Sequence, residues 1–331
     1  MEHNKTGTTI IILTLVSFLM ISCADAGAAY SDAEKVSMQA LSTETPSSEP
    51  TVTAEPSPSN EIPAFKATPE TAEPYTLDFV DVFGQHYQTL IDTDLPMNPY
   101  TDEGFIREDD IKKYEDDSFT CKVGVDVSRY QGKVDFQKIK DSGFEFVFIR
   151  LGYRGYGKTG SIQKDSMFDV NFINAVDAGL DVGVYFFSQA VNEEEAREEA
   201  DFVLTTLNRI KNDNSMKELK LLGIVYDPES ILDHEARTDD VTKEQFTINT
   251  IAFLDKVSNE GYVPYLYCNM LWEAYMLEMD KIFDKGYGIW YADYEEFPQT
   301  PYDFEIWQYT NEGSVPGIQG NSDINIRFIP K

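Results

Sequence analysis

Two carboxylates follow a short apolar run in the middle of the chain. Residues 221–230 read LLGIVYDPES, so Asp227 and Glu229 stand two positions apart with Pro228 between them. Side chains at i and i+2 of an extended segment share a face, with Cα atoms roughly 6.6–7 Å apart. Carboxyl groups so placed suit cleavage of a glycosidic bond, in which one acid donates a proton and another group is charged. The alternative is a helix N-cap, because Asp or Ser beside Pro begins many helices.

Other polar and aromatic side chains stand where further apolar segments end. They are Asp126, Ser128, Arg150, Tyr185, Trp290, Tyr291, Asp293, Trp307 and Gln308, and Asp323 lies in the last strand-like piece. In a barrel the carboxyl ends of the strands meet on one face. Burying unpaired carboxylates is costly, so four acids in one cleft favour a site that perturbs their ionisation. Each residue taken singly also has a purely structural explanation. Asp126 could cap a turn, Asp323 could be a solvated acid, and the tryptophans could be core residues.

Strand-like and helix-like segments alternate from residue 122 onward. Expected helices are 134–143, 165–179, 192–211 and 242–260, and they separate expected strands at 122–128, 145–152, 181–188, 221–229 and 263–269. Such alternation implies parallel pairing. After about residue 270 short strands at 286–294, 304–310 and 323–328 predominate. We therefore expect an α/β fold, a TIM-like barrel of about eight strands and five helices with a mostly β C-terminal part. An open doubly wound sheet is the alternative.

The composition limits the partners and the cofactors. Acidic residues number 58 against 27 basic ones, a formal charge of −31. This charge argues against nucleic acid and anionic membrane surfaces as partners. Three Cys and three His without ligand-like spacing predict no metal site, and we expect no cofactor. We also predict no disulfide between Cys121 and Cys268, because the expected strands place them roughly 17–20 Å apart at opposite ends of the barrel.

The N-terminus predicts export. An apolar run over residues 10–21 is too short to span a bilayer but matches the core of a signal peptide. Residues 1–23 resemble a bacterial lipoprotein signal, with Ser22 before a Cys23 that would carry the lipid, although Met20 stands where Leu is usual. The alternative is a secretory signal cleaved near residues 24–28. The expected location is the cell surface, or the medium in the second case.

Two segments separate this signal from the barrel. Residues 24–74 are rich in Ser, Thr, Pro and Glu with very few large apolar residues, which predicts a disordered tether. Residues 75–121 begin with alternating apolar and polar residues around a turn signal at Phe83–Gly84. A β-hairpin that packs on the main domain as a flap is expected there. The expected barrel domain is then 122–331.

Several motifs of residues 122–331 together resemble glycoside hydrolase family 25, the Chalaropsis-type lysozymes. These motifs are GVDVSRYQG, DVNFINAVDAGLDVGVYFF, YDPES, IWYADY and WQYTNEGSVPGIQGNSDIN, in the order and rough spacing of the family. The resemblance implies a flattened barrel of eight strands and about five helices. It also implies hydrolysis of the β-1,4 bond between N-acetylmuramic acid and N-acetylglucosamine in peptidoglycan. Apart from the resemblance, we expect a monomer whose only membrane contact is the lipid anchor.

The resemblance also assigns roles to residues. Glu229 matches the family's proposed general acid and Asp227 the carboxylate beside it, while Asp126 and Asp323 match the acids of the first and last strands. The remaining matches are positions expected to line the cleft in the family: Tyr185, Trp290, Tyr291 and Gln308, to which we add Arg150 as a strand-end residue. Pro228 departs from the family pattern but is harmless at a strand end. Asp227 would disfavour ionisation of Glu229 and suggests a substrate-assisted mechanism.

Two other functions are compatible with such a chain. One is a non-catalytic surface lipoprotein that binds cell-wall glycan through the same cleft, and the other is a barrel glycosidase acting on a different N-acetylated glycan. Loss of an acid would favour the binding protein, and all four acids are present.

Overall fold

A computed structural model describes residues 75–81, 84–108, 110–216, 218–231 and 234–331. The expected signal peptide, Cys23 and the tether lie outside these residues. Among the described residues, no helix combines the length and the apolar character that crossing a bilayer requires.

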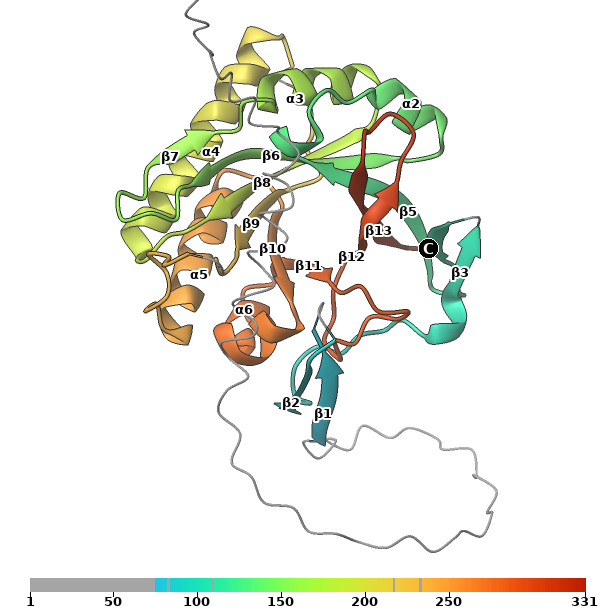
Figure 1. The fold of residues 1–331 in the computed structure, drawn as a ribbon, viewed down its shortest axis with the longest axis vertical. Coiled ribbons are helices and arrows are strands. Elements are labelled where there is room, and N and C mark those ends of the chain that lie inside the picture. The colour runs from blue at the N-terminus through green and yellow to red at the C-terminus, as the bar shows by residue number, and fades with distance from the viewer. Residues whose placement is uncertain (1–74, 82–83, 109, 217, 232–233) are drawn as a thin grey trace, which may run out of the picture.

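Eight strands close into a barrel (Figure 1). Their order is β5-β13-β12-β11-β10-β9-β8-β6, and β6 pairs with β5 to complete the ring. Their bounds are β5 Phe119–Val127, β6 Phe146–Arg154, β8 Asp181–Ser188, β9 Ile224–Pro228, β10 Pro264–Asn269, β11 Gly288–Ala292, β12 Ile306–Ser314 and β13 Asn321–Pro330. The short strand β7, Ile162–Lys164, adds to the outside of β6. The predicted barrel is confirmed, and the β5–β6 pairing excludes an open sheet.

Pairing is parallel from β5 through β6, β8, β9, β10 and β11 to β12, and antiparallel where β13 joins β12 and β5. The change of direction follows from the connections. A long crossover, helical everywhere except between β11 and β12, brings the chain back to the same end of the sheet and gives a parallel pair. The short link after β12 makes a hairpin instead. All strands except β13 therefore end at the same rim of the barrel.

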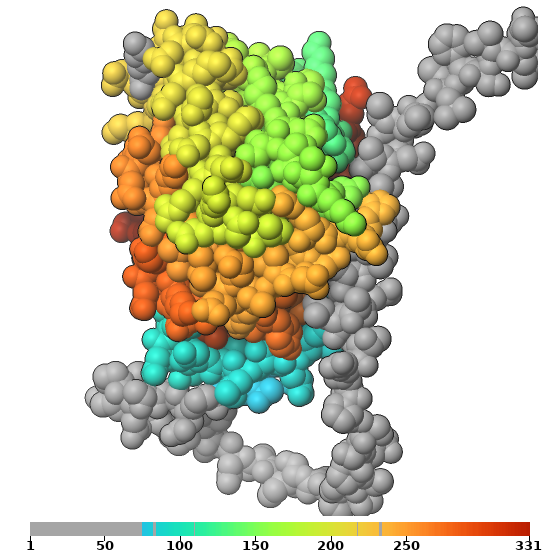
Figure 2. Space-filling view, turned by 90° about the vertical axis from the view of Figure 1, so that its left-hand side faces the viewer, coloured from blue at the N-terminus to red at the C-terminus, as the bar shows by residue number. Residues whose placement is uncertain are grey.

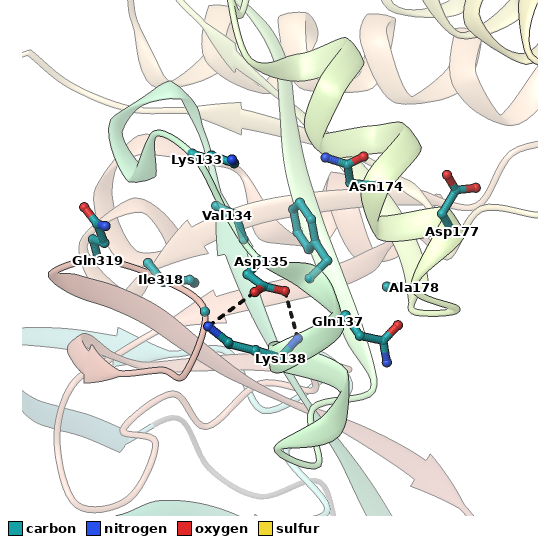
Figure 3. Close-up of a pocket in the computed structure, with 12 residues that line it drawn as sticks. Lys133, Val134, Asp135, Gln137, Lys138, Asn174, Asp177, Ala178, Ile318 and Gln319 are labelled. Atoms are coloured by element: carbon teal, nitrogen blue, oxygen red, sulfur yellow. Dashed lines mark hydrogen bonds and ion pairs between the residues drawn. The ribbon is translucent and has the colours of Figure 1, made fainter.

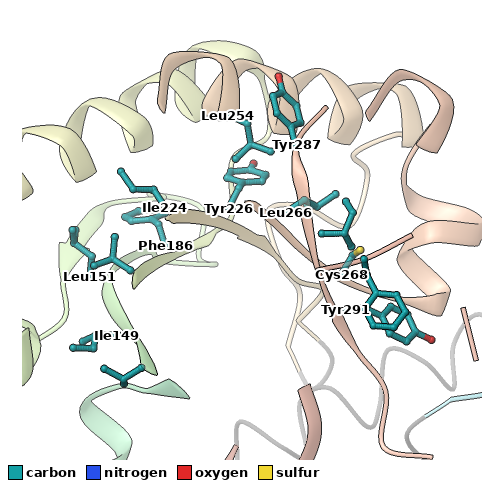
Figure 4. Packing of buried hydrophobic residues seen from close by; sticks show 14 of the residues in the cluster. Ile149, Leu151, Phe186, Ile224, Tyr226, Leu254, Leu266, Cys268, Tyr287 and Tyr291 are labelled. Carbon is teal, nitrogen blue, oxygen red and sulfur yellow. The ribbon is translucent and has the colours of Figure 1, made fainter. Parts of the chain in front are cut away.

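Helices cover the outside of the first half of the barrel. They are α2 Phe136–Asp141, α3 Phe168–Asp177, α4 Glu193–Asp213, α5 Lys243–Asn259 and α6 Met279–Phe283. Each longer helix has apolar residues on the face that meets the strands, and Figure 4 shows Leu254 of α5 above Tyr226 and Phe186 of the strands. Side chains that point outward from the strands thus form one core with the helices.

A second, smaller core fills the barrel itself. It contains Phe146, Phe148, Val225, Tyr265, Trp290 and Ile306. Glycines make room for these rings: a Cβ on Gly124 would lie 2.4 Å from the Phe146 ring, and one on Gly183 would lie 2.2 Å from the Phe148 ring. Small residues opposite large ones are how a narrow barrel interior is filled.

The N-terminal segment covers the half of the barrel that lacks helices. It consists of two hairpins, β1 Tyr75–Val80 with β2 His86–Ile91 and β3 Phe105–Glu108 with β4 Ile111–Tyr114, joined through the 3₁₀ turn Asp102–Gly104. Tyr100 stacks on Phe328 of β13 with ring centroids 3.7 Å apart, and Phe105 meets Trp307 of β12 edge to face at 5.3 Å. Figure 2 shows this segment, in blue and cyan, as a layer against the orange C-terminal part of the chain.

Candidate active site

Asp126 occupies the inward face of β5 near the rim of the barrel and is 6% exposed. Its Oδ2 accepts two hydrogen bonds, from Gln308 Nε2 on β12 at 2.9 Å and from Asn325 Nδ2 on β13 at 2.9 Å. Both donors sit on the strands that follow β5 around the ring. One oxygen of this carboxyl group is therefore fixed by two amides.

Aromatic donors orient both amides. Tyr267 OH donates to Gln308 Oε1 at 2.9 Å, and Tyr294 OH donates to the same oxygen at 3.0 Å. Trp290 Nε1 donates to Asn325 Oδ1 at 2.8 Å. Because each amide oxygen already accepts a hydrogen bond, each amide nitrogen must face Asp126.

Asp323 stands directly opposite Asp126 in the antiparallel register of β13 and β5. Side chains at such paired positions have Cβ atoms about 4.5–5.5 Å apart, so two charged carboxylates there repel each other. Burial raises the pKa of Asp126 to about 6, with a further rise from the charge of Glu229, while the two amide hydrogen bonds act in the opposite direction. Burial, followed by the charges of Asp126 and Glu229, raises the pKa of Asp323 well above its ordinary value.

The two carboxylates of the YDPES segment join this pair. Asp227 is a buried residue of β9, and Glu229 follows that strand directly. The charge of Glu229 acts on both Asp126 and Asp323, so it lies near both. Tyr185 of β8 is close enough to these acids for their charges to act on its hydroxyl group. Its pKa is raised mainly by burial, and also by the charges of Asp126, Asp227 and Asp323 against the opposing charge of Arg150. The rim thus brings the four predicted acids together.

Gln189, which follows β8, holds the segment that carries Glu229. Gln189 Nε2 donates to the carbonyl oxygen of Glu229 at 2.6 Å and to that of Ser188 at 2.9 Å, and its Oε1 accepts from Thr238 Oγ1 at 3.0 Å. The next helix, α5, begins at Lys243 with Thr242 as its N-cap. Neither Asp227 nor Glu229 caps α5, which excludes the helix-cap interpretation of the segment.

The other predicted site residues occupy different surroundings. Trp290 points into the barrel, is 2% exposed and stacks on Phe148 at 4.7 Å, beneath the amide of Asn325 that it orients. Tyr291 is fully buried on the opposite face of β11, where its hydroxyl donates to Asp293 at 2.9 Å. Arg150 is buried in an ion pair with Asp165, with its Nε 2.8 Å from Asp165 Oδ2. Arg150 is the register partner of Tyr185. Tyr291 lies on the helix-facing side of β11, apart from Asp126, Asp227, Glu229 and Asp323.

The hydrogen bonds around Asp126 and Glu229 form a network. Four of its residues were not predicted from the sequence: Asn325, Tyr267, Tyr294 and Gln189. The position of Asn325 could have been predicted from the sequence. It stands two positions after Asp323 in a strand, so the two side chains lie on the same face of that strand. Tyr267 shares a face with the buried Tyr265 in the same way. Gln189 and Tyr294 lie beyond strand ends, where no periodicity assigns a direction.

One hollow of the surface lies apart from these residues. Figure 3 shows this hollow, of about 590 Å³, between α2, α3 and the turn before β13, where Lys138 pairs with Asp135. Its lining contains none of the predicted site residues. Within the described ranges, His, Cys, Asp and Glu nowhere gather in a group of three or more that could hold a metal ion.

The barrel is similar in sequence to known glycosyl hydrolases. The model of glycosyl hydrolases family 25 matches residues 125–318. The autolytic lysozyme of Clostridium acetobutylicum is 28% identical over 205 residues, which are 61% of this chain and 54% of that protein. Lysozyme M1 of Streptomyces globisporus is 25% identical over 206 residues, 61% of this chain and 66% of that protein. This chain thus spans about half to two thirds of the length of these relatives.

Solved structures share the fold. The modular autolysin LytC from Streptococcus pneumoniae aligns with a TM-score of 0.54 and 20% identity over 76% of this chain and 56% of its own. It has also been solved in complex with a synthetic peptidoglycan ligand. The spore cortex lytic enzyme SleM of Clostridium perfringens aligns with a TM-score of 0.50 and 19% identity over 62% of this chain and 67% of its own.

Proposed function

The chain belongs to glycosyl hydrolases family 25, and from this premise we propose that it is a peptidoglycan hydrolase, an N-acetylmuramidase acting on the β-1,4 bond between N-acetylmuramic acid and N-acetylglucosamine. One observation carries the proposal most directly. Asp126, held by Gln308 and Asn325, stands opposite Asp323 near the rim of a closed barrel, and the charge of Glu229 raises its pKa further. A structural role does not account for this grouping, since burying like charges together costs stability.

In the proposed reaction Glu229 donates a proton to the leaving glycosidic oxygen. Glu229 is only partly buried, so a substrate in the cleft can reach its carboxyl group. Asp227 orients the acetamido group of the sugar, whose oxygen attacks the anomeric carbon as the glycosidic bond breaks. Water then opens the cyclic intermediate after giving a proton to Glu229, which restores the acid.

In the proposed reaction Asp126 and Asp323 stabilise charge and do not transfer the proton to the leaving group. A pKa of about 6 keeps Asp126 partly protonated near neutral pH, so the pair need not carry two full charges in one place. A negative charge shared by the pair stabilises the positive charge that develops on the sugar ring in an oxocarbenium-like transition state. Tyr185, whose pKa is raised by the charges of Asp126, Asp227 and Asp323 as well as by burial, would contact the same sugar.

The reaction is tested on purified peptidoglycan. Muropeptides released by the protein are analysed by mass spectrometry after borohydride reduction, with the Glu229→Gln variant as the control. Fragments that end in reduced muramic acid are expected. Fragments that end in reduced glucosamine would identify a glycosidase of different bond specificity, and binding without release would identify the glycan-binding lipoprotein instead.

The same proposal includes attachment to the membrane through Cys23. The support is the short apolar run that ends at Ser22–Cys23. Cys23→Ser is expected to move the protein from the membrane fraction to the medium. An unchanged distribution would contradict lipidation at this residue and would leave the hydrolase proposal untouched.

A further inference from the structure

A small cavity lies between the N-terminal hairpin and the rim of the barrel. Its volume is about 140 Å³. Phe79, Val80 and Asp81 line it from the β1–β2 hairpin. Asn269 lines it from the end of β10, and Leu271 and Tyr294 line it from the segments that follow β10 and β11. The hairpin precedes residues 125–318, the part of the chain that the family model matches. One wall of the cavity is therefore an addition to the family barrel.

The cavity adjoins the carboxylate network. Tyr294 lines it and donates through its hydroxyl to Gln308, which in turn donates to Asp126. Asn269 and Ala292 are the last residues of β10 and β11, at the rim where the carboxylates gather. A polymer bound across Asp126 on this side of the barrel would meet the hairpin next.

The hairpin wall is held in place by several contacts with the barrel. Gln299 accepts from the backbone N–H of Val80 at 2.8 Å and donates to the carbonyl oxygen of Val80 at 2.9 Å. The same amide nitrogen lies 3.2 Å from Asp293 Oδ2, and Tyr275 OH donates to the carbonyl oxygen of Gln88 at 2.6 Å. These contacts at both strands of the hairpin position the wall before any ligand binds.

The residues that line the cavity determine which chemical groups can bind there. Phe79, Met270 and Leu271 supply apolar surface, and the carboxyl groups of Asp81, Asp293 and Glu295 make part of the lining acidic. Asp81 and Asp293 also accept hydrogen bonds from within the protein. The described residues that line the cavity include no lysine or arginine, so an anionic group would be repelled. Since one water molecule takes about 30 Å³ of liquid, the cavity has room for roughly five water-sized groups. That room suits one substituent with a methyl group and an N–H donor.

We propose that this cavity is an added subsite that takes the N-acetyl group of one neutral sugar of the glycan strand, next to the sugars at the cleaved bond. The inference rests on the proposed glycan-hydrolase function. The methyl group would pack against Phe79 and Leu271, and the amide N–H would face the acidic side of the cavity. The hairpin would thus favour glycans that extend past the cleaved bond over short ones.

Binding and cleavage are measured separately to test this. Val80→Trp fills the cavity from a half-buried position, and Gly84→Asn adds a side chain at its edge, where the glycine has a φ of 75° that Asn tolerates and where its Cβ has open space. Leu90→Trp is the matched control, since Leu90 lies on the same hairpin, is 67% exposed and does not line the cavity.

Titration calorimetry with the pentamer of N-acetylglucosamine, on the Glu229→Gln background, is expected to show at least fivefold weaker binding for Val80→Trp and Gly84→Asn and no change for Leu90→Trp. The same variants with Glu229 present should lose kcat/KM on long glycan strands and keep it on a short chromogenic substrate. Equal affinity of all variants, or no pentamer binding by the parent protein, would overturn the subsite. Absence of cleavage by the unmodified protein would instead overturn the proposed hydrolase function, while the binding comparison still decides the subsite.

Discussion

Asp126 and Asp323 face each other across the antiparallel pair β5–β13, and their carboxyl groups share the inward side of the barrel. Folding therefore brings together two acids that ionise independently in the unfolded chain. Burial raises the pKa of each, and the charge of Asp126 adds to the rise for Asp323. The protein retains this pair at a cost in stability, and that cost can be measured.

Replacement of Asp323 by Asn is expected to stabilise the protein at neutral pH. Because folding raises the pKa of Asp323, the folded state penalises its ionised form. The penalty is absent below the ordinary pKa of 3.8 and grows as the pH rises above it. Urea denaturation should show little difference between wild type and variant near pH 4, and a gain of about 1–3 kcal/mol for the variant at pH 7. Asp117→Asn, at an exposed position, serves as the control. A gain at pH 7 no larger than that at pH 4 would contradict an electrostatic origin of the stabilisation.

The Glu229→Gln variant is expected to lose at least two orders of magnitude in muropeptide release. The amide is isosteric but has no acidic proton for the leaving oxygen, and general acid catalysis is typically worth about 10²–10⁴-fold. The melting temperature should change little, because Glu229 is only partly buried. Both quantities are measured on one sample. Unchanged turnover would exclude Glu229 as the acid.

Gln189 is expected to act as a positioning residue for Glu229. Thr238→Val removes the hydroxyl that orients the Gln189 amide, while Thr238→Ser keeps it. The valine variant should lower kcat by about tenfold with KM nearly unchanged, and the serine variant should retain most of the activity. A merely structural role would lower the melting temperature of the valine variant without changing kcat per folded molecule. Steady-state kinetics at a temperature well below the transition separates these outcomes.

Tyr100 is expected to be a main contact between the N-terminal segment and the barrel. Its ring stacks on Phe328, and its hydroxyl donates to the carbonyl oxygen of Phe304 at 2.8 Å. Tyr100→Ala should reduce the free energy of unfolding by about 3 kcal/mol, and Tyr100→Phe by about 1 kcal/mol, since the latter loses only the hydrogen bond.

The control for this experiment is Tyr75→Ala, a residue of the same segment that is 42% exposed. Its effect should stay within about 0.5 kcal/mol. An equally small effect of Tyr100→Ala in denaturant unfolding would mean that residues 75–118 do not stabilise the barrel.

Local patterns were sufficient to predict the barrel strands and the longer helices of residues 122–270, but not the short strand β7. Apolar runs predicted the strands, the 3.6-residue period predicted the helices, and glycines such as Gly143 and Gly179 ended them; both have positive φ in the structure. The spacing of Asp227 and Glu229 and the position of Asp126 at a strand end also follow from the sequence, because side-chain direction within one strand is a local property.

Which face of a strand turns inward was decided by the tertiary structure. Strands of a covered barrel are apolar on both sides, so alternation does not separate the interior from the helix-facing side. Trp290 and Tyr291 are adjacent, aromatic and buried, yet Trp290 supports the network and Tyr291 packs outside it. The sequence contains no local signal for this difference.

Contacts between distant segments were likewise decided only by closure of the barrel. Asp126 and Asp323 are about two hundred positions apart, and the antiparallel return of β13 puts them opposite each other. The N-terminal hairpins could be predicted as strands, but not their place over β11–β13, because that place depends on which side of the barrel lacks helices. The sequence by itself determined the elements and the acids; the order of strands around the ring determined which acids meet, since proximity across a sheet depends on pairing and not on chain distance.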